Sequence, residues 1–192
     1  HPDFLEQANR LADFHREADG ILVNVASTPH IYNEFSSGKQ DLVAIRDYVR
    51  MFYDRALTEE DMPLNVILFG DASFDYKAIG EDNGMYDDHN LVPTFQSYSS
   101  FKLGPSYCTD DFLGMLDPTE GQSASLPYDQ LDIGIGRLVV KDIQEAEEAV
   151  DKIIHYATGD TFGDWRNNLC FVADDVDDPN WEFRLVQNID KI

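Results

Sequence analysis

The chain has 192 residues, of which 43% are hydrophobic and 12% are aromatic, so it can bury a core and is not disordered by composition. Asp and Glu number 37 against 14 Lys and Arg, and a net charge of −23 makes nucleic acid a poor partner because such a surface repels phosphate groups. No hydrophobic run approaches the ~20 residues that a membrane-spanning helix needs.

The amino-terminal sequence HPDFLEQANRL has no methionine, no basic stretch and no hydrophobic stretch of a signal peptide. We therefore interpret the chain as a piece of a longer protein. Most of the acidic residues are expected to form a solvated surface, although acidic clusters also attract hard cations such as calcium.

Hydrophobic periodicity predicts the following elements in the first part of the chain. Apolar residues at helical spacing indicate a helix over 3–18, and GILVNVAS (20–27) is predicted to be a strand. A short helical turn over 30–35 precedes an amphipathic helix over 40–57. The segment 64–70 is almost entirely apolar, which is typical of a strand covered on both faces.

Residues 71–130 are rich in Gly, Ser, Asp and Tyr and contain only short apolar stretches. Connections of this length are usually functional or disordered, and the many aromatic residues here favour order. The next elements are a strand over 131–140, a helix over 141–157, a strand over 168–175 and a helix that begins at 179. Strands thus alternate with helices, which predicts an α/β fold with a mostly parallel sheet flanked by helices on both faces.

Carboxylates follow two of the predicted strands directly, Asp71 after NVILFG and Asp174-Asp175 after LCFVA. Ligands of open parallel sheets gather beyond the carboxyl ends of strands, so these acids are candidates for holding a cation or a catalytic partner. The alternative for Asp71 is that its side chain only caps a loop by accepting backbone N–H groups. Asp132 lies near the start of its strand, and Asp129 precedes it by three residues.

The common hydrolase signatures are absent from the sequence: there is no GxSxG, no HExxH and no phosphate-binding glycine loop. Two cysteines are too few for a disulfide framework. Cys170 lies in an apolar strand pattern and is expected to pack as a small hydrophobic residue, whereas Cys108 lies in a polar loop with no histidine near it in sequence. The acid-rich segment 80–90 lacks the spacing of an EF-hand calcium loop.

Motifs in almost the whole chain resemble the gingipain-type cysteine peptidases, and the match is closest to the PorU-type sortases of the type IX secretion system. The motifs occur in the order of the family: AIRDYVRMFYDRA, VILFGDASFDYK, LVPTFQS, TDDFLGMLD, LDIGIGRL, KIIHYA and WRNNLCFVADD. Two motifs of the family are absent, namely the GHG-like turn of the catalytic histidine and the later nucleophilic cysteine. The resemblance therefore implies the N-terminal part of a peptidase domain over 1–192, ending before the histidine and the cysteine.

The resemblance also implies roles for four acidic residues. In the relatives, an acid after the LC-x-x-A strand orients the catalytic histidine, and this motif places it at Asp175. The relatives also hold structural calcium with the acid of the GD motif and an acid at the entry of the IGR strand, which fall on Asp71 and Asp132. Asp129 is a plausible additional ligand.

Two hypotheses for function remain open at this stage. The first is a fragment of a calcium-supported cysteine endopeptidase or sortase at the bacterial cell surface, which cleaves C-terminal sorting signals from secreted protein cargo and transfers the cargo to a surface acceptor. Its partners would be the cargo and the remainder of the peptidase domain, and the fragment itself would be inactive. The alternative is a non-catalytic α/β module for binding or assembly at the cell surface.

Overall fold

A computed structural model describes residues 1–73, 90–97, 106–121, 129–159 and 162–170. The chain divides into two compact units, His1–Ile154 and His155–Ile192, which are described separately. The described helices and strands are, in chain order, α1 (Leu5–Ala18), α2 (Thr28–Phe35), α3 (Leu42–Arg55), β1 (Asn65–Phe69), β2 (Phe95–Gln96), β3 (Cys108–Thr109), β4 (Gly134–Leu138) and α4 (Ile143–Thr158).

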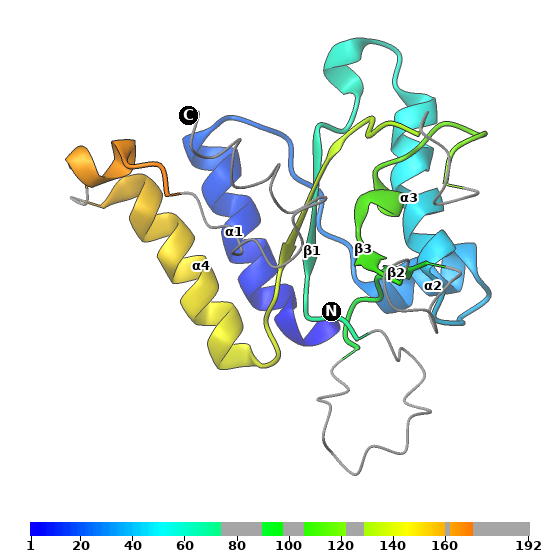
Figure 1. The fold of residues 1–192 in the computed structure, drawn as a ribbon, viewed down its shortest axis with the longest axis horizontal. Coiled ribbons are helices and arrows are strands. Elements are labelled where there is room, and N and C mark those ends of the chain that lie inside the picture. The colour runs from blue at the N-terminus through cyan, green and yellow to red at the C-terminus, as the bar shows by residue number, and fades with distance from the viewer. Residues whose placement is uncertain (74–89, 98–105, 122–128, 160–161, 171–192) are drawn as a thin grey trace, which may run out of the picture. The chain divides into compact units, whose positions relative to one another are not determined.

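The parallel pair β1–β4 is the centre of the first unit. Asn65 is paired with Gly134 and Phe69 with Leu138, so the two strands run in register over five residues. Helices α1 and α4 lie on one side of this pair and α2 and α3 on the other (Figure 1). The fold is thus α/β with parallel strands between helices, which confirms the predicted fold class.

Alternate residues of β1 face the two helical layers, as the period of a strand requires. Leu68 packs in a cluster with α2 and α3, which contribute Ile31 and Ile45 among others. Phe69 faces the opposite cluster, which includes Leu11 of α1 and Val150 of α4. Burial on both sides therefore explains the apolar residues at the carboxyl end of β1, Leu68 and Phe69, whereas Ile67 earlier in the strand is 52% exposed.

The predicted helices over 3–18, 40–57 and 141–157 agree with α1, α3 and α4 to within a few residues. Asp41 begins α3 as its N-cap, and its side chain accepts a hydrogen bond from the Val43 N–H at 2.8 Å. Pro29 stands in the first turn of α2, where a missing N–H has no cost. No described helix has the length and apolar character needed to cross a membrane.

The strand predicted over 20–27 is wrong, because this segment takes no place in a β-ladder. Two of its apolar residues are exposed, since the exposed fraction is 48% for Ile21 and 98% for Leu22. The Val23 carbonyl accepts a hydrogen bond from Arg16 Nε at 3.2 Å rather than from a neighbouring strand. An apolar pattern indicates extended backbone, but a strand also needs a partner that offers free N–H and C=O groups.

The predicted strand over 168–175 is not formed in its described part, where Leu169 is 81% exposed, and 171–175 lie outside the described residues. The helix predicted from 179 also lies outside them. Within the predicted loop 71–130, the described residues include the short antiparallel pair β2–β3 and a 3-10 turn over Asp111–Leu113.

Arg137 of β4 holds the loops at the carboxyl end of β1 together. Its guanidinium forms two hydrogen bonds with the carboxylate of Asp110, from Nε at 2.8 Å and from Nη2 at 2.7 Å. It also donates to three carbonyl oxygens, those of Gly70 at 2.8 Å, Val92 at 2.7 Å and Pro93 at 3.3 Å. The side chains of Arg137 and Asp110 are 10% and 21% exposed, so this is a partly buried, bidentate ion pair with additional backbone acceptors.

Burial by itself would raise the pKa of Asp110, but the hydrogen bonds and the positive charge of Arg137 outweigh it. A further hydrogen bond, from the Thr94 hydroxyl at 2.9 Å, acts in the same direction as Arg137. The pKa of Asp110 therefore lies below its ordinary value of 3.8.

We predict that this pair makes the free energy of unfolding depend on pH in the acidic range. Because folding lowers the pKa of Asp110 below its unfolded value of about 3.9, the contribution is fully present above that pH and is lost as the pH falls through the folded-state pKa. Urea unfolding of the wild type and Asp110→Asn from pH 2 to pH 7 measures it. The variant should lose up to about 3–5 kcal/mol at pH 7, because Arg137 stays buried without its carboxylate, and much less at pH 2. An equal loss at both pH values would contradict the assignment.

Candidate functional site

The turn after β1 is built around Gly70 and Asp71. Gly70 has a φ of 139°, which only glycine adopts without strain, and a Cβ there would lie 3.1 Å from Val92 Cγ2. The Asp71 side chain accepts a hydrogen bond from the Ala72 N–H at 2.8 Å, and the Asp71 carbonyl accepts from the N–H groups of Leu91 and Val92, both at 3.0 Å. The Asp71 side chain thus accepts a backbone N–H of its own turn, as a capping residue does.

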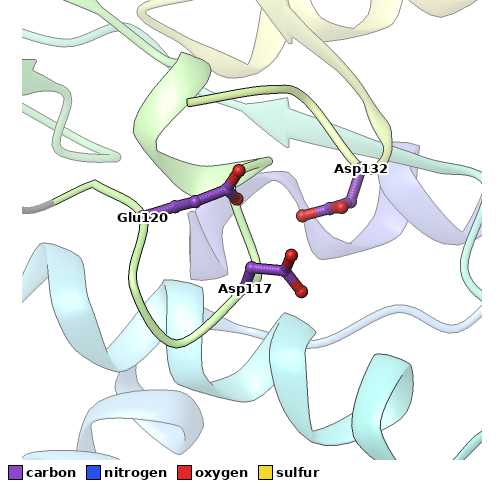
Figure 2. A group of neighbouring side chains, drawn as sticks. All are labelled: Asp117, Glu120 and Asp132. Carbon is purple, nitrogen blue, oxygen red and sulfur yellow. The ribbon is translucent and has the colours of Figure 1, made fainter. Parts of the chain in front are cut away.

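A second group of carboxylates lies before β4, at the opposite end of the strands. Figure 2 shows that Asp117, Glu120 and Asp132 converge. One carboxylate oxygen from each residue lies within 4.8 Å of the others. We call these three residues the acidic cluster. Asp117 and Glu120 come from the loop after the Asp111–Leu113 turn, and Asp132 comes from the segment that leads into β4.

Asp132 is fixed by hydrogen bonds to two other segments. Its Oδ2 accepts from the Leu116 N–H at 2.6 Å, and its Oδ1 accepts from the Tyr53 hydroxyl at 3.4 Å. The negative charge of Asp132 is the main cause that raises the pKa of Tyr53 above its ordinary value. The carboxylate of Asp132 is thus held between the loop and α3.

Glu120 carries an oxygen without a donor. Its Oε1 accepts from the Gln130 N–H at 3.1 Å, whereas its Oε2 is buried and has no hydrogen-bond partner among the described residues. A buried carboxylate oxygen without a donor or a cation is costly. Asp129 lies next to this loop, since its Oδ2 accepts from the Gly121 N–H at 3.1 Å, but it is not one of the three converging residues.

Arg46 of α3 determines the path of the loop that carries Asp117 and Glu120. It is 8% exposed and donates to three carbonyl oxygens, from Nε to Met115 at 2.6 Å and from Nη2 to Asp117 and Glu120, both at 3.1 Å. Its guanidinium also lies 5.1 Å from the centre of the Phe112 ring. Burial lowers the pKa of Arg46, and the nearby charge of Glu120 is among the influences that raise it.

The predicted ligands Asp71 and Asp132 do not lie together. In the register of β1 and β4, Asp132 precedes its strand by two positions and Asp71 follows its strand by two, so they lie at opposite ends of the pair. This offset is eight residues, or roughly 26 Å along the strands. One ion cannot contact both carboxylates. Asp175 lies outside the described residues.

The sequence analysis did not identify Asp117 and Glu120 as members of the acidic cluster. It also did not identify Arg46 and Arg137 as the residues that hold the loops. Asp117 is the last residue of the motif TDDFLGMLD, which resembles the family, so the motif itself pointed to Asp117 as a candidate. No motif pointed to Glu120, because its place depends on contacts with Arg46, which is 74 residues away in the chain.

The surroundings of Cys108 do not favour a nucleophile. Burial and the charge of Asp110 raise the pKa of Cys108, which disfavours the reactive thiolate. Cys170 is exposed and lies outside any described strand, so the prediction that it packs as a small hydrophobic residue is wrong.

Comparisons with known proteins agree with the resemblance. The chain is similar to dimeric latent PorU from Porphyromonas gingivalis, with 34% sequence identity and a TM-score of 0.70 over 88% of this chain and 16% of that chain. A search of curated proteins found no match. The family model for peptidase family C25 matches residues 1–192. The chain therefore belongs to peptidase family C25, the gingipain family of cysteine peptidases.

Proposed function

We propose that residues 1–192 form the N-terminal α/β part of the catalytic region of a gingipain-type cysteine peptidase. The family match over the whole chain carries this proposal. The parallel pair β1–β4 supports it, since its carboxyl edge is where an open α/β sheet binds ligands and Arg137 orders the loops there. Because the chain spans 16% of the PorU chain, the activity of a whole protein is inferred and not observed.

We further propose that the protein acts in the sortase branch of the family, at the bacterial cell surface and within type IX secretion. Its substrates would be secreted proteins with a C-terminal sorting signal. A cysteine thiolate attacks the carbonyl carbon before the signal, the signal leaves as an amine, and an amine of a surface acceptor then displaces the thiolate from the thioester. The similarity to PorU supports this branch.

The nucleophile and its imidazole base are proposed to lie outside this chain, because the sequence holds neither family motif. Asp175 would contribute by accepting a hydrogen bond from the imidazole, which fixes the tautomer and stabilises the charged ring. The second candidate function, a non-catalytic binding or assembly module, is favoured for the isolated chain by the same missing motifs.

The acidic cluster is our proposed calcium site, in place of a site that combines Asp71 with Asp132. Calcium prefers six to eight oxygen ligands, and three converging carboxylates supply hard oxygens at one place. The buried Oε2 of Glu120, which has no donor among the described residues, fits a cation as its missing partner. Calcium would supply positive charge that draws the 117–120 loop and Asp132 together.

We predict that the isolated chain of 192 residues does not cleave peptides. Activity toward an unstructured protein substrate, with and without a thiol alkylating reagent, is the measurement. Cleavage that alkylation abolishes and that disappears in Cys108→Ala or Cys170→Ala would overturn the placement of the nucleophile outside this chain.

In the longer protein, we predict that Asp175→Asn lowers kcat by about 10²–10⁴-fold with little change in KM, because the imidazole loses its orienting carboxylate. The neighbouring substitution Asp174→Asn is the matched control and should have a much smaller effect. Steady-state kinetics on a cargo-derived peptide separates the two. A larger loss of kcat in the Asp174 variant would mean that Asp174, and not Asp175, orients the imidazole.

Calcium is expected to raise the melting temperature of the chain. A ligand that binds only the folded state adds about 2.7 kcal/mol at one hundred times its Kd, which is several degrees for a chain of this size. Glu120→Gln should abolish the shift, whereas Asp71→Asn should leave it unchanged. Differential scanning fluorimetry with calcium, and with magnesium as a second ion, tests this. A shift that survives Glu120→Gln but not Asp71→Asn would move the site to the other end of the strands.

A further inference from the structure

We propose that Arg137 is a positioning residue for the peptidase site, because it joins the three chain segments that form the carboxyl edge of β1 and β4. The role in catalysis rests on the proposed function, whereas the joining of the segments rests on contacts alone. Arg137 contacts neither a reacting atom nor a substrate in this structure, so it would act through the loops that it holds.

The three segments come from distant parts of the chain. They are the turn after β1, reached through the Gly70 carbonyl; the segment before β2, reached through Val92 and Pro93; and the residue after β3, reached through Asp110. Arg137 is separated in sequence by 67 residues from Gly70 and by 27 residues from Asp110. One side chain thus contacts all three segments.

These segments have little other regular structure that could hold them. The pair β2–β3 has only two residues in each strand, and the β1–β4 ladder ends at Phe69 and Leu138. Beyond the ladder, the Gly70 and Asp71 N–H groups donate to the carbonyl oxygens of Leu138 and Val140, and the Thr94 hydroxyl donates to Asp110. The turn and the segment before β2 meet where Asp71 accepts the N–H groups of Leu91 and Val92. Arg137 binds the residues next to these contacts on both sides, so its removal should loosen the whole edge.

Arginine is required for this arrangement, because its planar group offers five N–H donors in a fixed fork. Lysine at this position would keep the charge but could not bind the carboxylate with two parallel hydrogen bonds and also reach three carbonyls. Arg137→Lys therefore keeps the positive charge but removes the forked set of hydrogen bonds to Asp110 and the carbonyl oxygens. Arg50→Lys is the matched control, since Arg50 forms an ordinary ion pair with Asp54 within α3.

Amide hydrogen exchange on the chain of 192 residues tests the contacts directly. In Arg137→Lys we expect protection of the Leu91 and Val92 amides, which donate to the Asp71 carbonyl, to fall by about tenfold or more, with the amides of α1, α3 and the β1–β4 ladder unchanged. Arg50→Lys should leave all of these as in the wild type. An equal fall over the whole chain, or no fall at the edge, would overturn the proposal.

Chemical rescue separates a positioning role from general stability. In Arg137→Ala, guanidinium at tens of millimolar should restore part of the edge protection, and in the longer protein it should restore part of kcat; sodium chloride at equal concentration should do neither. Restored protection without restored kcat, in a longer protein whose wild type is active, would refute the positioning role. A wild type without thiol-dependent activity would instead refute the proposed function, and the exchange result would still decide whether Arg137 joins the segments.

Discussion

Two buried guanidinium groups hold the loops at the two ends of the β1–β4 pair. Arg137 binds three carbonyl oxygens and Asp110 at the carboxyl end, and Arg46 binds three carbonyl oxygens of the 115–120 loop near the acidic cluster. Irregular loops leave backbone carbonyl groups without ladder partners, and such groups must be satisfied when they are buried. One arginine with five donors satisfies several of them at once.

The two arginines differ in how their charge is balanced. Arg137 faces a carboxylate, and the pair keeps Asp110 ionised despite its burial. The described hydrogen bonds of Arg46 go to carbonyl oxygens, and the charges of Asp47, Glu120 and Asp129 act on it from a distance. The acidic character of the loop around the cluster is therefore also part of what makes a buried Arg46 tolerable.

The helices were predictable because each carries a long apolar face, and β1 was predictable because its apolar run is short and ends at Gly70. The segment 20–27 has a similar run, but whether a strand forms depends on a partner that composition does not specify. The separation of Asp71 from Asp132 was implicit in the sequence, since one acid follows its strand and the other precedes a parallel strand. The position of Glu120 was not implicit in the sequence, because it depends on a hydrogen bond from Arg46, which lies on a helix far away in the chain.

The distance between the two ends constrains how a cation could affect the peptidase. An ion at the acidic cluster would lie roughly 26 Å along the strands from the turn at Asp71. Because the Coulomb interaction falls with distance, the field of such an ion would be weak at the carboxyl edge. It could not polarise a substrate there. Its effect on activity would pass through the folding of the 115–120 loop and the start of β4, and so through the stability of the strand that carries Arg137.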